Sequence, residues 1–129
     1  MNGNKKSVVF VVNPISGTRS KRFIYNLINK FTDREKFSWE IVKTGRAGHA
    51  VEIAAQAVKN NTDIVVAIGG DGTVNEVARS LVHTRTALGI IPCGSGNGLA
   101  RHLQIPLEPH RAIEAFNESI IDTIDYGKI

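Results

Sequence analysis

The chain lacks the features that define several classes of protein. Among its 129 residues there are one cysteine, four prolines and few aromatic residues: one Trp, two Tyr and five Phe. Cys93 alone cannot form an internal disulfide, which excludes a disulfide-stabilised scaffold and predicts a reducing, cytoplasmic setting. The hydrophobic share of 42% excludes a disordered chain, and the prolines are too few for a collagen-like one. The composition predicts one ordinary soluble domain.

Long apolar segments are lacking as well. The longest apolar runs, at residues 8–12 and 64–68, have five residues each, whereas about 20 are needed to span a bilayer. The N-terminus does not show the basic, apolar and small-residue order of a signal peptide. Any contact with a membrane is therefore expected to be peripheral.

Charge is present but unevenly distributed. Residues 1–46 carry ten Lys/Arg against three Asp/Glu, and residues 47–129 carry six against nine. A basic segment of this kind attracts phosphates, anionic lipid surfaces or nucleic acid without distinguishing among them. A solvated basic face without a partner is an equally open interpretation.

Short apolar runs alternate with helical patterns along the chain. Residues 7–12, 63–68 and 87–91 are typical of strands buried on both faces, and residues 37–43 alternate as a strand near a sheet edge does. Three apolar stripes have helical spacing: Ile24, Leu27, Ile28 and Phe31; Val51, Ala54, Ala55 and Val58; Val74, Val77, Ala78 and Leu81. The order predicts an α/β fold with three layers: a mostly parallel, doubly wound sheet with helices on both faces.

Further elements are predicted toward the C-terminus. They are a short helix at residues 99–103, a helix at 109–116 with proline at its start, and a strand at 120–124. The sequence is still typical of a strand at residue 129, so we expect a further part of the protein to follow. Phe23, Phe31 and Phe116 are expected in the core.

Nine of the twelve glycines lie in four loops, each of which follows a predicted strand. In a parallel sheet these loops share the carboxyl edge, where open α/β sheets bind ligands. Glycine lets backbone N–H groups approach a ligand closely, and helix N-termini favour anions, so phosphate is the expected ligand. The alternative is that turns between strands and helices need glycine in any case. That would explain one such loop, but it explains four less well than a phosphate site does. The glycines are Gly17; Gly45 and Gly48; Gly69, Gly70 and Gly72; Gly94, Gly96 and Gly98.

Two common phosphate motifs are missing. No Gly-Lys-Ser/Thr segment exists, which excludes a P-loop. Residues 94–99 read GSGNGL, with leucine at the third glycine position of a dinucleotide fingerprint. A hydride-transferring dinucleotide enzyme is therefore not expected.

Asp71 lies within a glycine turn, in the segment GGDGTVNE at residues 69–76. A carboxylate beside phosphates is repelled unless Mg²⁺ intervenes or the carboxylate acts as a base toward an attacking hydroxyl. Both roles indicate phosphoryl transfer. The alternative is that Asp71 is the N-cap of the following helix, although Thr73 could take that place.

Taken together, the loop segments resemble the diacylglycerol kinase and sphingosine kinase superfamily. The matching segments are Asn13-Pro14-Ile15-Ser16-Gly17, Thr44 with Gly48-His49-Ala50, residues 69–76, and Pro92-Cys93-Gly94-Ser95-Gly96-Asn97. The GGDGT segment alone is shared with NAD kinases, and a NAD-kinase-like phosphotransferase or a non-catalytic nucleotide-binding module is the alternative.

The resemblance implies a NAD kinase-like fold and a function. Residues 1–129 would be the diacylglycerol kinase catalytic, ATP-binding domain of a lipid kinase that uses ATP and Mg²⁺. The acceptor would be the hydroxyl of a diacylglycerol or sphingoid-type lipid at a membrane surface. A β-rich lipid-binding domain, absent from this chain, would complete the site, so residues 1–129 alone would show little turnover.

Residue roles follow from the same resemblance. Asp71 matches the proton acceptor of the sphingosine kinases, whereas bacterial diacylglycerol kinases are thought to use a carboxylate of the second domain. Asp125 matches a residue of the Mg²⁺ network. Asn97-Gly98 departs from the Asn-Asp of the bacterial relatives and resembles the sphingosine kinase branch. Nucleotide contacts are implied for Asn13, Pro14, Ser16, Gly17, Thr44, Gly48, Gly69, Gly70, Asp71, Gly72, Thr73, Asn75, Gly94, Ser95, Gly96 and Asn97.

The histidines and the cations near the N-terminus are not assigned to catalysis. His49 is expected to cap or line the second loop, and the histidine spacing predicts no zinc site. A basic binding module is a non-enzymatic alternative, but its cations have no interleaved aromatic residues, so nucleic acid is not expected as a partner. The oligomeric state is left open. The cations of that module are Lys5, Lys6, Arg19, Lys21 and Arg22.

Overall fold

Four parallel strands form the centre of the molecule, in the order β2-β1-β3-β4. The structure, a computed structural model, describes residues 5–14, 21–92, 105 and 108–118. In the register of the sheet, Val8 lies beside Trp39 on one side and Ile64 on the other. The strands are β1 (Lys6–Val12), β2 (Phe37–Lys43), β3 (Ile64–Gly69) and β4 (Ala87–Pro92).

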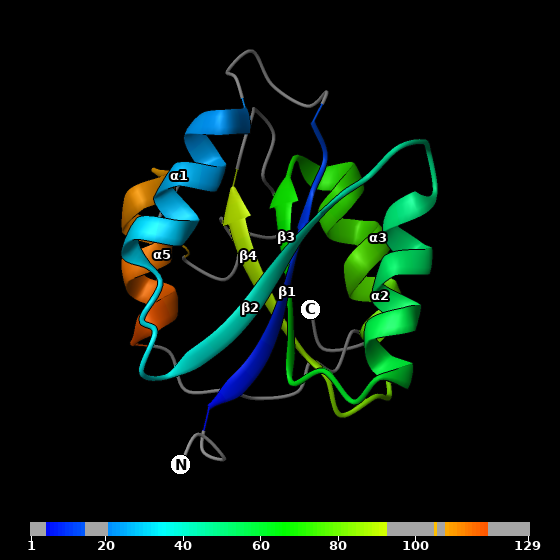
Figure 1. Cartoon of the computed structure of the whole chain (residues 1–129). Helices are drawn as coiled ribbons and strands as arrows, with labels where there is room; N and C mark the ends of the chain where they lie inside the picture. Colours follow the sequence, from blue (N-terminus) through cyan, green and yellow to red (C-terminus); the bar gives the residue numbers. More distant parts are fainter. Residues whose placement is uncertain (1–4, 15–20, 93–104, 106–107, 119–129) are drawn as a thin grey trace.

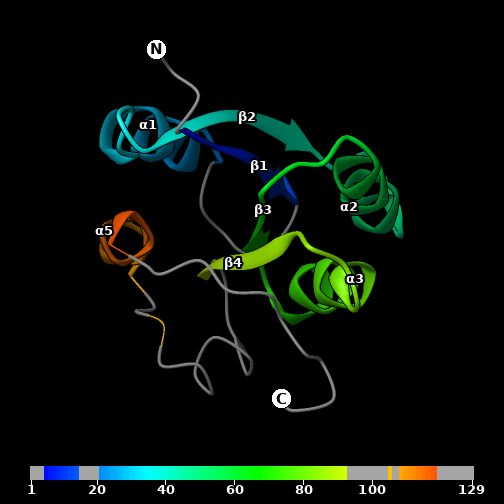
Figure 2. The same cartoon turned by 90° about the horizontal axis from the view of Figure 1, so that it is seen from below.

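Helices cover both faces of this sheet. One face carries α1 and α5, and the other carries α2 and α3 (Figure 1), a separation that is also clear from below (Figure 2). The three-layer, parallel α/β architecture predicted from the sequence is therefore confirmed. The helices are α1 (Lys21–Phe31), α2 (His49–Lys59), α3 (Asp71–Leu81) and α5 (Pro109–Asn117). None of the described helices combines the length and apolar character needed to cross a membrane.

The chain winds in two directions from the centre of the sheet. From β1 it passes through α1 to the outer strand β2, then crosses through α2 to β3 and continues outward through α3 to β4. The direction changes between β1 and β3. There the backbone N–H of Asn13 donates to the carbonyl of Ile68 at 3.3 Å. Crevices at the carboxyl ends of strands on either side of such a switch point are the usual ligand sites of open α/β sheets.

The core lies on both faces of the two central strands. All six residues of β3 are buried, as expected of a strand covered by helices on each side. The helical stripe of α3 is confirmed, with all four predicted residues buried, and in α1 Ile24 and Ile28 are buried while Leu27 and Phe31 pack partly buried against them.

Two predictions about buried residues are wrong. In α2 the predicted stripe is only half right: Ala54 is buried and Val58 is partly buried, but Val51 and Ala55 are exposed, and Ala50 and Ala57 are buried instead. Phe23 is 38% exposed, because its place in the helical rotation lies at the edge of the buried stripe of α1. The elements predicted at residues 99–103 and 120–124 lie outside the described residues.

Helix α5 begins as predicted, with Pro109 at its first position. Its N-cap is Glu108, whose carboxylate accepts the backbone N–H groups of His110 at 3.0 Å and Arg111 at 3.1 Å. The hydrogen bond from His110, the larger cause, and that from Arg111 lower the pKa of Glu108. These bonds satisfy donors that have no acceptor within the helix.

Phe116 anchors α5 to the sheet. Its ring stacks on Phe37 with centroids 4.7 Å apart and meets Phe10 edge-on at 6.0 Å. A Cβ on Gly89 of β4 would lie in ordinary contact with the Phe116 ring at 3.5 Å, but only 2.9 Å from Cγ2 of Val66 on the neighbouring strand. The position of α5 therefore depends on an aromatic cluster, and Gly89 is required by the packing of β4 beside Val66.

Candidate functional site

A cavity of about 500 Å³ lies where the loops after β1, β2 and β3 meet. Its size falls within the usual range for small-molecule sites. The cavity is next to the switch point between β1 and β3, so it occupies the place where this type of sheet binds ligands. Its wall is formed by Asn13, Pro14, Thr44, Gly45, Arg46, Ala47, Gly48, Ala50, Gly72, Thr73 and Glu76.

The first loop is joined to helix α3 by side chains. The amide Nδ2 of Asn13 donates to the hydroxyl of Thr73 at 3.4 Å, although the two residues are 60 positions apart. Thr73 is buried and Asn13 is half-buried. This contact places the end of β1 against the first turn of α3 and fixes one side of the cavity.

The second loop is held by its own short-range hydrogen bonds. The N–H of Gly45 donates to Nδ1 of His49 at 2.7 Å, and the N–H of His49 donates to the carbonyl of Arg46 at 3.1 Å. Because Nδ1 accepts, the ring proton of neutral His49 lies on Nε2. The expectation that His49 caps or lines this loop is confirmed.

The second loop ends in a left-handed glycine. Gly48 is the N-cap of α2 and has φ of 79°. A side chain in this conformation is strained whatever the space around it, so the turn that brings the loop to the cavity requires glycine.

Helix α3 brings its first turn to the cavity. Its N-cap is Gly70, in an extended conformation, and Asp71 is the first helical residue. The alternative that Asp71 or Thr73 is the N-cap is therefore wrong. The carboxylate of Asp71 lies in the first turn, where the helix dipole favours a negative charge.

Gly72, the second residue of α3, leaves an open part of the wall. A Cβ built on it would meet no atom within 4 Å. Packing of the described residues does not explain why this position is glycine. A ligand that approaches the first turn of the helix would explain it, because the N–H groups at the start of a helix have no acceptor within it.

Among the described residues of the cavity wall, two carry charge. Glu76 lies one turn after Gly72 on α3, and Arg46 projects from the second loop. Arg46 forms a two-bond ion pair with Glu52, with Nη2 to Oε1 at 2.8 Å and Nη1 to Oε2 at 2.6 Å. The hydrogen bond from Arg46 is the main cause that lowers the pKa of the Glu52 carboxyl, and the same bond raises the pKa of Arg46.

The structure brings together part of the predicted site. On the wall it places Asn13, Pro14, Thr44, Gly48, Gly72 and Thr73. Gly69, Gly70, Asp71 and Asn75 belong to the adjoining turn and helix but are not among the lining residues, and Asn75 is exposed. Ser16, Gly17, Gly94, Ser95, Gly96, Asn97 and Asp125 lie outside the described residues.

Sequence reasoning missed several wall residues. Arg46 stands between two glycines of a predicted loop, and Glu76 follows Gly72 by four positions, which places both on one side of a helix. These spacings in the sequence could have indicated that Arg46 and Glu76 lie on the wall. The missed residues are Arg46, Ala47, Ala50 and Glu76, whereas Gly45 was expected at this edge with the other loop glycines.

The fold is a doubly wound α/β domain with a cavity at its switch point, and the sequence identifies the family. The profile of the diacylglycerol kinase catalytic domain matches residues 7–129, and the chain belongs to this family. It is 33% identical over 128 residues to the diacylglycerol kinase of Staphylococcus saprophyticus, which covers 97% of this chain and 42% of that protein. The diacylglycerol kinase of Bacillus subtilis is also 33% identical, with 96% and 42% covered.

Solved structures agree with the sequence comparison. The crystal structure of a diacylglycerol kinase from Bacillus anthracis superposes with a TM-score of 0.73 at 26% identity, covering 88% of this chain and 42% of that one. Another solved structure from the same organism gives a TM-score of 0.77 at 25% identity, covering 92% and 40%. The NAD kinase-like fold is thereby confirmed. The chain spans about two fifths of the length of these relatives.

Proposed function

We propose that this chain is the ATP-binding domain of a lipid kinase, which transfers the γ-phosphoryl group of ATP to a lipid hydroxyl. The observation that carries the proposal is the cavity at the switch point, where three loops meet on one wall. Membership of the diacylglycerol kinase catalytic domain family supports it.

In this proposal the loops hold the phosphates of the nucleotide. Gly72 and Thr73 offer backbone N–H groups at the start of α3, and the open space beside Gly72 allows a close approach. Asn13 and Thr44 add side-chain donors from the other two loops. Gly69, Gly70, Asn75 and the sequence-predicted positions outside the described residues remain part of the proposed site.

Asp71 is the proposed base. During transfer the lipid oxygen forms a bond to the γ-phosphorus, and the bond from that phosphorus to the β–γ bridging oxygen breaks. The hydroxyl proton must leave, and the carboxylate of Asp71, at the start of α3, is the group proposed to accept it. Catalysis of this kind depends mainly on positioning and on stabilising charge.

Magnesium fits the acidic residues of this end of the sheet. No group of three or more His, Cys, Asp or Glu that could hold a metal occurs among the residues that the structure describes. Mg²⁺ in kinases needs only one or two carboxylates, since phosphate oxygens and waters complete its shell. Glu76, on the wall, is the described candidate, with Asp125 proposed from sequence. When bound, the ion would neutralise phosphate charge.

The lipid acceptor is proposed to bind outside this cavity. We propose that a β-rich domain of the whole protein holds a diacylglycerol or sphingoid-type lipid, and that the protein works in the cytoplasm at a membrane surface. Since phosphoryl transfer depends on holding both reactants, residues 1–129 alone should bind nucleotide weakly and turn over little.

Product analysis tests the proposal. The protein at its natural length is incubated with Mg²⁺, γ-labelled ATP and micelles that contain diacylglycerol or sphingosine, and in parallel with NAD. We expect a labelled lipid phosphate and no labelled NAD. Labelled NADP would instead identify a NAD-kinase-like enzyme, and nucleotide binding without any phosphorylated product would indicate a non-catalytic module.

A further inference from the structure

Arg46 is unusual among the residues of the cavity wall. Within the described lining it is the only cation, Glu76 is the only anion, and the other residues are neutral. A nucleoside triphosphate carries several negative charges, and guanidinium groups bind phosphate through two parallel hydrogen bonds. The described part of the wall has no net charge, so within it Arg46 is the residue that can attract such a ligand.

The present partner of Arg46 is on the surface. The side chains of Arg46 and Glu52 are 58% and 59% exposed, although their geometry is that of a two-bond ion pair. Exposed ion pairs contribute little to folding because water solvates the separated charges well. The pair can therefore be exchanged for another anion at small cost.

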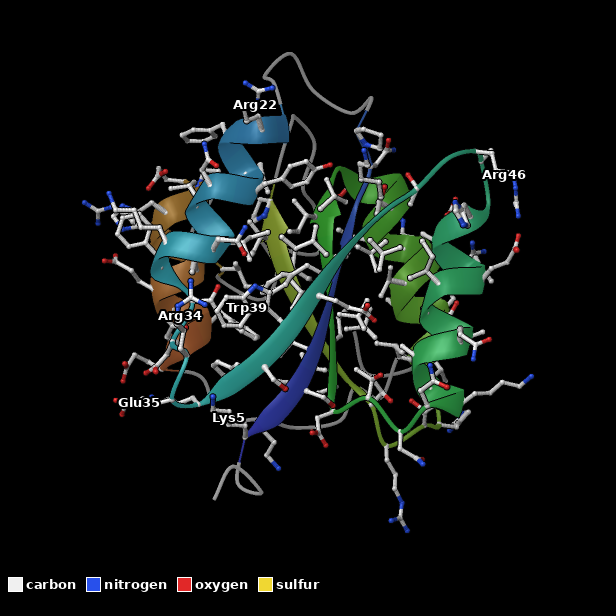
Figure 3. The ribbon with its side chains drawn as sticks, in the orientation of Figure 1. Lys5, Arg22, Arg34, Glu35, Trp39 and Arg46 are labelled. Atoms are coloured by element: carbon white, nitrogen blue, oxygen red, sulfur yellow. The ribbon has the colours of Figure 1, made fainter. Side chains whose placement is uncertain are left out.

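The backbone around Arg46 is already positioned for this exchange. Figure 3 shows Arg46 at the turn that enters α2, with its side chain on the outer side of the helix. The hydrogen bonds among Gly45, Arg46 and His49 fix the turn, so the loop itself need not move. Arg46 also lines the cavity, and its side chain can change partner by rotation about its own bonds.

We propose that Arg46 is a phosphate-binding residue, and that Glu52 competes with the nucleotide for it. In the free protein the guanidinium pairs with Glu52, and in the nucleotide complex it pairs with phosphate oxygens. The proposal deepens the proposed function and rests on it, because it assumes that the cavity takes the phosphates of ATP.

A purely structural role makes the opposite prediction for Glu52. If the ion pair only ties the second loop to α2, removing either partner loosens the same loop and weakens nucleotide binding in the same direction. If Glu52 competes, removing its charge releases Arg46 and strengthens binding. The sign of the effect of Glu52 separates the two roles.

The experiment compares Arg46→Gln and Glu52→Gln in the protein at its natural length. Dissociation constants for ATP and for adenosine are measured by titration calorimetry. Arg46→Gln should weaken ATP binding about ten- to a hundredfold, the usual effect of losing charged hydrogen bonds. Glu52→Gln should strengthen it about two- to fivefold. Adenosine affinity should be unchanged in both variants.

Two further variants sharpen the result. Arg46→Lys keeps the charge but not the paired hydrogen bonds, so it should restore part of the lost ATP affinity. Arg34→Gln removes an arginine whose guanidinium lies over the Trp39 ring at 5.1 Å, far from the cavity wall, and should leave ATP affinity unchanged. Thermal melts establish that each variant is folded.

Three results would overturn the inference. If Glu52→Gln weakens ATP binding as Arg46→Gln does, the ion pair between them only holds the second loop against α2. If both variants bind ATP as the wild type does, Arg46 does not contact phosphate. In either case the wild type still prefers ATP to adenosine, and the proposed function stands. If the wild type shows no preference for ATP, the proposed function fails and the inference fails with it.

Discussion

Asp71→Asn should lower lipid phosphorylation by the protein at its natural length about two to four orders of magnitude, with little change in its melting temperature. This is the usual effect of removing a positioned acid or base. Asparagine has nearly the same shape as aspartate and keeps an acceptor oxygen, but it cannot take a proton at neutral pH. Turnover is measured at saturating ATP so that a change in nucleotide affinity does not obscure the result.

The place of Asp71 in the fold explains why stability should be retained. It is the first residue of α3, after the extended Gly70, and its side chain is half-buried. The charge it loses is worth about 0.3–1 kcal/mol to the helix through the dipole. Such a change is small beside the free energy of unfolding of a typical domain.

A matched carboxylate variant is available as a control. Glu35 is exposed in the turn before β2, at the opposite end of the sheet from the cavity (Figure 3). Glu35→Gln should leave turnover unchanged. Near-normal turnover of Asp71→Asn would place the base elsewhere.

Phe116→Ala should lower the free energy of unfolding by about 3–5 kcal/mol, the usual cost of deleting a buried phenylalanine ring. The ring is only 8% exposed and is packed between Phe37, Phe10 and the surface left open by Gly89. Its loss leaves a cavity between α5 and the sheet. Because domains are typically stable by about 5–15 kcal/mol, this variant should be close to unfolding.

The same substitution at Phe23 provides the control. Phe23 is 38% exposed on α1, so Phe23→Ala should cost less than about 1 kcal/mol. Urea denaturation of the two variants and the wild type measures both effects. Equal losses would show that α5 does not pack on the sheet through Phe116 as described.

The strands and their order could be predicted because their signal is local. Continuous β-branched runs such as residues 64–68 indicate burial on two faces, and their alternation with helices restricts the sheet to parallel topologies. The buried face of α2 could not be assigned in this way. Alanine is found on both sides of that helix, so the predicted stripe was right at Ala54 but included the exposed Val51 and Ala55 and omitted the buried Ala50 and Ala57. Tertiary contacts decide between faces of nearly equal hydrophobicity.

The candidate site could be predicted only in part for a similar reason. Loops that follow parallel strands must share one edge, so the meeting of Asn13, Thr44 and Gly72 was foreseeable. The contact of Asn13 with Thr73 depends on how α3 lies across the sheet, which no spacing in the sequence specifies. Arg46 and Glu76 were missed because charged residues are most often solvated surface residues.

Backbone amide shifts during an ATP titration test the central claim most directly, namely that the cavity at the switch point binds nucleotide phosphates. The groove at the start of β2, in the region of Lys5 and Trp39 (Figure 3), is an internal control at the other end of the sheet. In the ¹⁵N-labelled protein we expect the largest shifts at Asn13, Gly45, Gly48, Gly72 and Thr73. The amides of Lys5, Asn29, Ser38 and Trp39 should not move. Shifts confined to that groove, or no shifts at saturating ATP, would contradict the account.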